Sequence, residues 1–229
     1  MSDDGARFLI AVTGLRAEAR IAERSAGVRA VAGGGDTARL DKLVRQLAAQ
    51  GGDAIISFGF AAGLAPDCSA GACVVGREVV YEDCSYSADP AWTGSIKKLI
   101  GCAELVTIAG VDRPLTCPSE KQVLYQTRGA VAADMESHVV ARIAAELALP
   151  FAVLRVIADP AERALPQAAI AGMKADGGVD VGAVLASLAT SPGQLPGLIR
   201  VAVEAGRARA ALFRCGDLLG SGLGFRDLS

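Results

Sequence analysis

The sequence is poor in the side chains that build metal sites and disulfide frameworks. It has one histidine, His138, in 229 residues, and its six cysteines form no C-x-x-C pair. A structural zinc site needs four Cys or His ligands at close spacing, so the sequence predicts no metal site. The cysteines are therefore expected to be small core or surface residues.

The chain also lacks an excess of basic or acidic residues, and it lacks long apolar runs. The 23 Lys and Arg residues are balanced by 25 Asp and Glu, and the two signs are interspersed, so the chain offers no basic field to a nucleic acid. The longest uncharged stretch near the centre, residues 54–66, is shorter than the ~20 residues of a membrane-spanning helix. The N-terminus MSDDGARF lacks the basic start of a secretory signal, which predicts a cytoplasmic protein.

Apolar residues are what the chain has in excess. Hydrophobic residues make up 52% of it and the mean hydropathy is +0.37, which indicates a large buried core. At this length we expect a single domain, residues 1–229, in which the glycine-rich residues 216–229 form a loose tail.

Strand-like and helix-like segments alternate along the chain. Helical spacing predicts helices at residues 15–25, 37–50, 118–126 and 134–149 and towards the C-terminus, and apolar runs predict strands at residues 8–13, 28–32, 54–60, 73–82, 104–109, 129–133 and 150–158. This alternation predicts an α/β fold, a three-layer sandwich with a mainly parallel mixed central sheet. Ligands bind such sheets at the carboxyl ends of the strands.

Two acids stand where an apolar run ends, in VAADMES at residues 131–137. On a helix that starts at Asp134, Glu136 falls in line with Val140 and Ile143, on the stripe that the helix buries. One interpretation is that Asp134 caps the helix and that Glu136 gains ~0.3–1 kcal/mol from the helix dipole. The other is that Glu136 accepts hydrogen bonds from hydroxyl groups of a ligand, which would explain an acid on the buried face.

A third acid, Asp159, directly follows the strand predicted at 150–158. Partial burial there would raise the pKa of its carboxyl toward that of a general acid, although Asp before Pro is also common at turns. The GGGD at 33–36 can be a tight turn or an anion cradle, and it lacks the spacing of nucleotide-binding loops. His138 lies on a different helix face from Glu136, so it is expected to be a surface or partly packed residue.

Four motifs, taken in order, resemble the purine nucleoside phosphorylase and methylthioadenosine nucleosidase superfamily. They are TGLRAE at 13–18, FGFAAG at 58–63, ADMES at 133–137 and LRVIADPA at 154–161. The resemblance spans about residues 7–165. Within the superfamily, DMESHVVARIAAELALPFAVLR and the RVIADPAERALP that follows are most similar to the phosphorylases associated with hopanoid biosynthesis, which are implicated in removing adenine from adenosylhopane.

The resemblance implies roles that the residues alone leave open. Met135 and Glu136 would hold the ribose, Glu136 by accepting hydrogen bonds from its hydroxyl groups, and Asp159 would donate to N7 of the purine. The loop that lines base and sugar would be formed by Gly59, Phe60 and Ala61. Breaking a glycosidic bond builds positive charge on the ribose and negative charge on the purine, so an anion near the sugar and an acid at the base both stabilise the transition state.

The sequence departs from the family where the nucleophile is expected. The nucleosidases have a glutamate in the first loop that activates water, and here Glu18 lies near that position with Ala19 as the alternative occupant. The phosphorylases often hold phosphate with arginine and serine around the third strand, where this chain has Ser57 and Phe60.

Phosphate would then be bound by other residues. Gly14 together with Arg16 or Arg20 is the candidate set, because a glycine loop frees backbone N–H groups and a guanidinium matches two phosphate oxygens. Either arginine can equally be a solvated charge on a helix.

These observations predict a cytoplasmic, homo-oligomeric enzyme with Asp159 and Glu18 as catalytic residues. Its substrate is expected to be an adenosine-type nucleoside with a bulky apolar 5′ substituent, cleaved by phosphorolysis, with inorganic phosphate as co-substrate and no cofactor, nucleic-acid partner or membrane span. Two alternatives remain open. One is a purine nucleosidase that uses water, and the other is a non-catalytic nucleoside-binding protein of the same fold.

Overall fold

The computed structural model describes residues 7–172, 174 and 178–225. Within them the chain forms one eight-stranded sheet. Its strands are β1 (Phe8–Thr13), β2 (Val28–Ala32), β3 (Gly52–Gly63), β4 (Cys73–Tyr81), β5 (Cys84–Ser87), β6 (Glu104–Gly110), β7 (Ala132–Asp134) and β8 (Phe151–Asp159).

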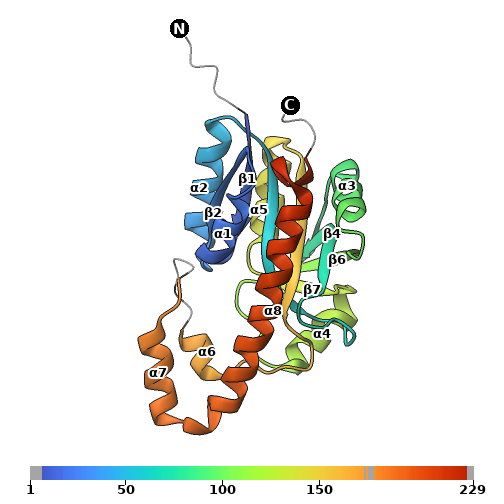
Figure 1. The fold of residues 1–229 in the computed structure, drawn as a ribbon. Coiled ribbons are helices and arrows are strands. Elements are labelled where there is room, and N and C mark those ends of the chain that lie inside the picture. The colour runs from blue at the N-terminus through green and yellow to red at the C-terminus, as the bar shows by residue number, and fades with distance from the viewer. Residues whose placement is uncertain (1–6, 173, 175–177, 226–229) are drawn as a thin grey trace.

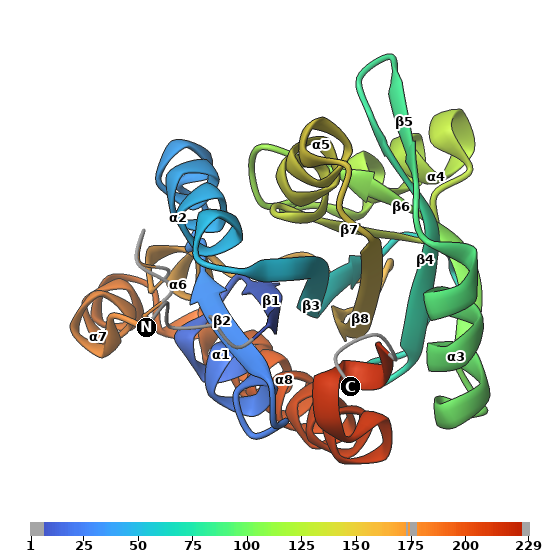
Figure 2. The ribbon, with the colours of Figure 1, turned by 90° about the horizontal axis from the view of Figure 1, so that it is seen from above.

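Strand β8 closes part of this sheet into a ring. The strand order is β2-β1-β3-β7-β6-β4-β5, and β8 pairs with both β3 and β4. It runs parallel to β3 and antiparallel to β4. The strands β3, β7, β6, β4 and β8 therefore form a closed ring, and β1 and β2 extend the sheet beyond β3 (Figure 2). Most pairings are parallel, which confirms the predicted α/β fold with a mainly parallel mixed sheet.

Helices cover the sheet on both sides (Figure 2). Helices α2 (Thr37–Ala49) and α5 (Ser137–Leu147) lie on one face, and α1 (Arg16–Ala22), α3 (Pro90–Ile100) and α8 (Leu195–Leu219) lie on the other. Successive residues of β1 alternate between the two cores, since Leu9 packs with the second group of helices and Ile10 with the first. The central strands are thus buried on both faces, which explains their continuous apolar sequences.

Two helices extend the molecule beyond the sheet. Helices α6 (Gln167–Ala171) and α7 (Val181–Thr190) follow the end of β8 and lie beside the first turns of α8 (Figure 1). None of the ten residues of α7 is buried. Among the described residues, none of the helices combines the length and the apolar character that crossing a membrane requires.

One element boundary and one helix in the middle of the chain differ from the prediction. Helix α5 begins at Ser137 and not at Asp134, because Asp134 is the last residue of β7 and caps the helix from there. Its Oδ1 accepts from the backbone N–H groups of Glu136 at 2.9 Å and of Ser137 at 2.6 Å. The apolar pattern also does not predict α3, although Asp89 and Pro90 are typical residues for a helix start and Asp89 does cap α3.

The C-terminal residues are packed and not loose. Helix α8 continues to Leu219, and the 3-10 turn Ser221–Gly224 follows, in which Leu223 is fully buried. The indole Nε1 of Trp92 donates to the carbonyl oxygen of Leu223 at 3.1 Å. The expected loose tail is therefore replaced by packed structure over residues 216–225, while residues 226–229 lie outside the described part of the chain.

Replacing Leu223 with Ala tests this packing. Removing a fully buried leucine should lower the free energy of unfolding by about 2–4 kcal/mol, because the cavity cannot close completely. The control is Leu218→Ala, since Leu218 is 55% exposed and its loss should change the free energy of unfolding by less than about 0.5 kcal/mol. Urea denaturation measures both, and equal small effects would contradict the packed C-terminus.

Candidate active site

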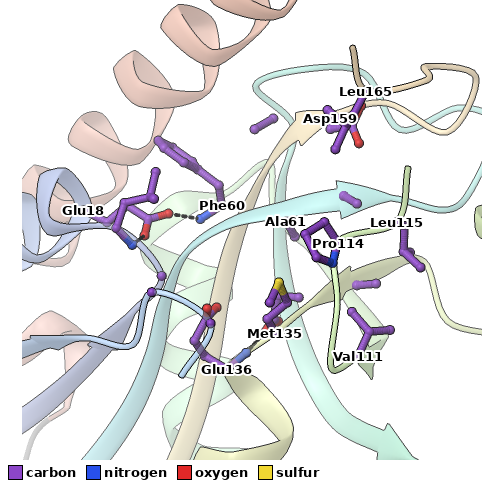
Figure 3. Close-up of a pocket in the computed structure, with 18 of the residues that line it drawn as sticks. Glu18, Phe60, Ala61, Val111, Pro114, Leu115, Met135, Glu136, Asp159 and Leu165 are labelled. Carbon is purple, nitrogen blue, oxygen red and sulfur yellow. Dashed lines mark hydrogen bonds between the residues drawn. The ribbon is translucent and has the colours of Figure 1, made fainter. Parts of the chain in front are cut away.

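A pocket opens where β1, β2, β6, β7 and β8 end (Figure 3). Its volume is about 210 Å³. The described residues that line it are Gly14, Leu15, Glu18, Gly34, Gly35, Phe60, Ala61, Ala62, Val111, Pro114, Leu115, Ala133, Asp134, Met135, Glu136, Ala158, Asp159, Leu165 and Lys174. The site therefore lies at the carboxyl-terminal edge of the sheet, where ligands of such folds bind.

The lining is acidic at two separate places. Glu18 and Glu136 lie on one side of the pocket, and Asp159 lies on the other, with Ala61, Pro114 and Met135 between them (Figure 3). Among the described lining residues, Lys174 is the one basic residue, and its Nζ lies 3.6 Å from Oδ2 of Asp180 at the surface. In spite of these acids, the described part of the chain has no group of three His, Cys, Asp or Glu side chains placed to hold a metal ion.

A buried arginine lies behind the first acidic side. Arg155 of β8 is 0% exposed. Its Nη2 donates to Oδ1 of Asp134 at 2.9 Å and to Oγ of Ser57 at 2.5 Å, and lies 3.3 Å from Oε2 of Glu136. Its Nη1 donates to the carbonyl oxygen of Phe60 at 3.1 Å. A buried cation is tolerated only when it is paired, so these contacts hold β3, β7 and the start of α5 in one arrangement.

Glu136 sits directly above this arginine with its carboxyl group almost fully buried. Burial raises the pKa of Glu136 to about 7, against the attraction of Arg155 and with the help of repulsion from Asp134. The loop after β1 approaches closely, since a Cβ on Gly14 would lie 3.1 Å from Oε1 of Glu136. Glu136 is thus placed to accept hydrogen bonds from the hydroxyl groups of a ligand in the pocket.

Glu18 of α1 is held by backbone groups. Its Oε2 accepts from the N–H of Leu15 at 2.5 Å, and its Oε1 accepts from the N–H of Phe60 at 2.6 Å. Burial raises the pKa of Glu18, and Arg155 and these N–H groups oppose the rise. Gly59 makes room for it, because a Cβ there would lie 2.6 Å from Oε1 of Glu18. Once ionised, a carboxylate fixed in this way can act as a general base.

Asp159 forms the acid on the opposite side. Its Oδ2 accepts from Nζ of Lys121 at 2.6 Å, and the lysine side chain is fully buried. Burial raises the pKa of Asp159, and Lys121 opposes the rise. Its Oδ1 is buried and has no hydrogen-bond partner among the described residues. Asp159 therefore has one oxygen paired with a buried cation and one without a hydrogen-bond partner among the described residues.

The pocket brings together most residues that the sequence predicts for the site. Gly14, Glu18, Phe60, Ala61, Met135, Glu136 and Asp159 all line it. Gly59 is not in the lining, and it contributes by letting Glu18 approach the backbone of β3.

The two predicted phosphate-binding arginines do not line the pocket, contrary to the prediction. Arg16 and Arg20 border a different surface cleft, together with Arg39. They are four residues apart and share one face of α1, whereas Glu18 lies two residues from each and is buried on the opposite face. The helix that brings Glu18 to the pocket therefore turns both arginines away from it.

Two buried cations of the site are missing from the sequence prediction. Arg155 left a signal, because it interrupts the apolar run PFAVLRVIA with a charge that a buried strand has to pair. Lys121 left none, because it lies in the polar sequence PSEKQVLYQTR. His138 is buried against Tyr81 with ring centroids 4.2 Å apart, and it is not part of the pocket lining.

The raised pKa of Glu136 predicts a pH-dependent cost in stability. The carboxyl titrates near 4.5 when unfolded and at about 7 when folded, so the fold loses stability as the pH rises through this window. A Glu136→Gln variant resembles the protonated form, and at pH 8 it should exceed the wild type in free energy of unfolding by on the order of 1–3 kcal/mol, a difference that vanishes near pH 4.

Urea denaturation at both pH values measures this difference. The control is Glu23→Gln, which changes an exposed glutamate at the end of α1 and should show no such pH dependence. A Glu136→Gln variant less stable than the wild type at pH 8 would contradict the account of this carboxyl.

Comparison with known proteins agrees with the fold. A search of curated proteins gave no significant match. The chain is similar in structure to the 5′-methylthioadenosine/S-adenosylhomocysteine nucleosidase of Streptococcus pneumoniae, with a TM-score of 0.65 and 16% identity over 91% of this chain and 98% of that one. It is similar to the Helicobacter pylori counterpart with a TM-score of 0.64 and 15% identity over 93% of this chain and 99% of that one. It is also similar to the futalosine hydrolase of H. pylori (0.57, 15%, 67% and 88%). At these identities the likeness shows the fold. The sequence model of the Phosphorylase superfamily matches residues 37–190, more than half of the chain, and the chain therefore belongs to this superfamily.

Proposed function

We propose that the protein is an enzyme that cleaves the N-glycosidic bond of a purine nucleoside, with water as the nucleophile. The observation that carries the proposal is the placement of Glu18 and Glu136 on one side of the pocket and Asp159 on the other (Figure 3). Membership of the Phosphorylase superfamily and the fold shared with nucleosidases support it.

The side formed by Glu136 suits the sugar. Its carboxylate accepts hydrogen bonds from ribose hydroxyl groups, while Met135 covers the ring. As the glycosidic bond breaks, positive charge develops on the ribose, and the carboxylates of Glu136 and Glu18 stabilise it. Burial raises the pKa of Glu136 to about 7, so ribose hydroxyl groups that donate to its carboxylate would favour the ionised form.

The side formed by Asp159 suits the base. The electron pair of the C1′–N9 bond moves onto the purine, and a proton from Oδ1 of Asp159 to N7 makes the purine a better leaving group. Burial raises the pKa of Asp159, which keeps it protonated to a higher pH than an exposed aspartate.

Water fits the nucleophile position better than phosphate. The arginines expected to hold phosphate border another cleft, and the described lining contains four carboxylates against one lysine, Lys174. A phosphate dianion would meet repulsion in such a pocket. Glu18 instead accepts a proton from water as the water oxygen bonds to C1′, which gives the free purine and a ribose that keeps its 5′ substituent.

The apolar part of the lining suits a 5′ substituent without charge. Val111, Pro114, Leu115 and Leu165 form one wall of the pocket (Figure 3). At about 210 Å³ the pocket is smaller than the ~300–1,000 Å³ of most ligand sites, so a large substituent would extend out of it. The apolar wall supports an adenosine with an apolar 5′ group, and adenosylhopane, whose bulky part would lie outside the pocket, is the proposed example.

The first test is release of adenine from 5′-substituted adenosines in phosphate-free buffer and in buffer with phosphate. We expect equal rates in both and free pentose as the second product, measured by chromatography. Release only with phosphate, together with a pentose 1-phosphate, would identify phosphorolysis. No release from any adenosine in either buffer would contradict the enzymatic function and favour a nucleoside-binding protein.

The second test is Asp159→Ala. Loss of the acid should lower kcat about 10²–10⁴-fold, because the purine would then leave unprotonated. Asp217→Asn is a suitable control, since Asp217 is an exposed residue of α8 outside the pocket lining and its change should leave kcat as it is. An Asp159→Ala variant with wild-type turnover would remove Asp159 from the reaction.

A further inference from the structure

Lys121 is an unusual residue for its position. It is the one buried residue of α4 (Pro118–Arg128), and its side chain is 0% exposed. Its Nζ donates to Oδ2 of Asp159 at 2.6 Å, to the carbonyl oxygen of Pro160 at 2.8 Å and to that of Arg163 at 3.0 Å. An ammonium group has three hydrogens, so all of them are used by the last residue of β8 and the segment that follows it.

These contacts give the two oxygens of Asp159 different surroundings. Oδ2 is bound to a cation, and Oδ1 has no partner among the residues that the structure describes, although it is buried. A buried polar atom without a partner is costly, and Asp159 lines the pocket. Oδ1 is therefore the carboxyl oxygen whose hydrogen-bonding capacity the described protein residues leave unused.

Further charges lie near this pair, and most of them are already paired. On α8, Glu204 binds Nε of Arg163 at 2.9 Å, and Glu162 lies 3.6 Å from Nη2 of the same arginine. Burial raises the pKa of Asp159 most strongly, and Lys121 opposes this rise. Glu204 and Glu162 add smaller contributions that also raise it. Lys121 is thus the cation in direct contact with Asp159.

We propose that Lys121 is a positioning residue for the proposed glycosidic cleavage: it holds Oδ2 of Asp159 so that Oδ1 alone meets N7 of the purine, and its charge stabilises the carboxylate that remains after the proton has moved. The proton passes from Oδ1 to N7 while the C1′–N9 electron pair moves onto the purine. Asp159 ends as a carboxylate beside the ammonium group of Lys121. This inference rests on the proposed function.

The expected signature is a change in the alkaline limb of the pH profile of kcat/KM. Without the cation, the pKa of Asp159 rises, so Asp159 stays protonated to a higher pH but is a weaker acid. In Lys121→Met the limb should move upward by about 1 unit or more, because an opposite charge at this distance lowers a carboxyl pKa by about 1–3 units. The plateau rate should fall by about 10-fold or more.

Two further variants separate charge from packing. Lys121→Gln keeps a donor without the charge and should move the limb in the same direction as Lys121→Met. Lys121→Arg keeps the charge and should leave the limb within about 0.3 units of the wild type. Lys98→Met, a change to an exposed lysine of α3, is the control and should leave the profile unchanged. If Lys121→Met does not fold, the comparison of Lys121→Gln with Lys121→Arg shows whether the charge of Lys121 sets the alkaline limb.

If the alkaline limb of kcat/KM lies at the wild-type pH in both Lys121→Met and Lys121→Gln, the proposal is overturned and Lys121 has a packing role only. The carboxyl stretching band of Asp159, assigned by its loss in Asp159→Asn, gives the same titration by infrared spectroscopy without any turnover. Absence of adenine release by the wild type would count against the proposed function, whereas an active wild type with an unmoved limb and band counts against Lys121 alone.

Discussion

The pocket depends on the buried guanidinium of Arg155. It joins Ser57 and Phe60 of β3 to Asp134 at the end of β7 and to Glu136 at the start of α5. Without it, several carboxylates would be buried beside one another with no cation, and breaking a buried ion pair typically costs about 3–5 kcal/mol. Arg155 therefore joins β8 to β3, to the end of β7 and to the start of α5, and it fixes the position of Glu136 at the pocket.

Both acidic sides of the pocket follow the same arrangement. Arg155 lies behind Glu136, Lys121 lies behind Asp159, and neither cation is part of the lining. Most charged groups that a ligand meets are acids within a largely apolar lining, and a buried cation supports Glu136 and Asp159 from within the protein. Such a site suits a substrate that becomes cationic at its sugar and accepts a proton at its base, because the groups that stabilise this charge are already in place before the reaction.

The sequence predicts this architecture well where the signal is local. Continuous apolar strands such as β1, β3 and β8 are buried on both faces, so their sequences reveal them, and Glu136 and Asp159 follow β7 and β8 at the predicted edge. Prediction fails where the outcome depends on tertiary packing. In the sequence Lys121 is indistinguishable from other polar helix residues, because the carbonyl oxygens that pair with it belong to the distant segment after β8.

Two other differences have equally physical causes. Arg16 and Arg20 lie close to Glu18 in sequence, but the helix turns them to the opposite face. The glycine-rich C-terminus reads as loose, yet Gly220 and Gly222 adopt positive φ values and turn the chain so that Leu223 reaches the core. In both cases the amino-acid composition is compatible with the predicted and with the observed arrangement. The path of the backbone decides which of the two forms.

The most direct test of the account is a crystal structure with a C-nucleoside analogue of adenosine, whose carbon–carbon glycosidic bond cannot be cleaved. We predict that the ribose hydroxyl groups lie within hydrogen-bond distance of Glu136, and that N7 of the base faces Oδ1 of Asp159. An analogue bound with its base beside Glu136, or bound outside this pocket, would contradict the account.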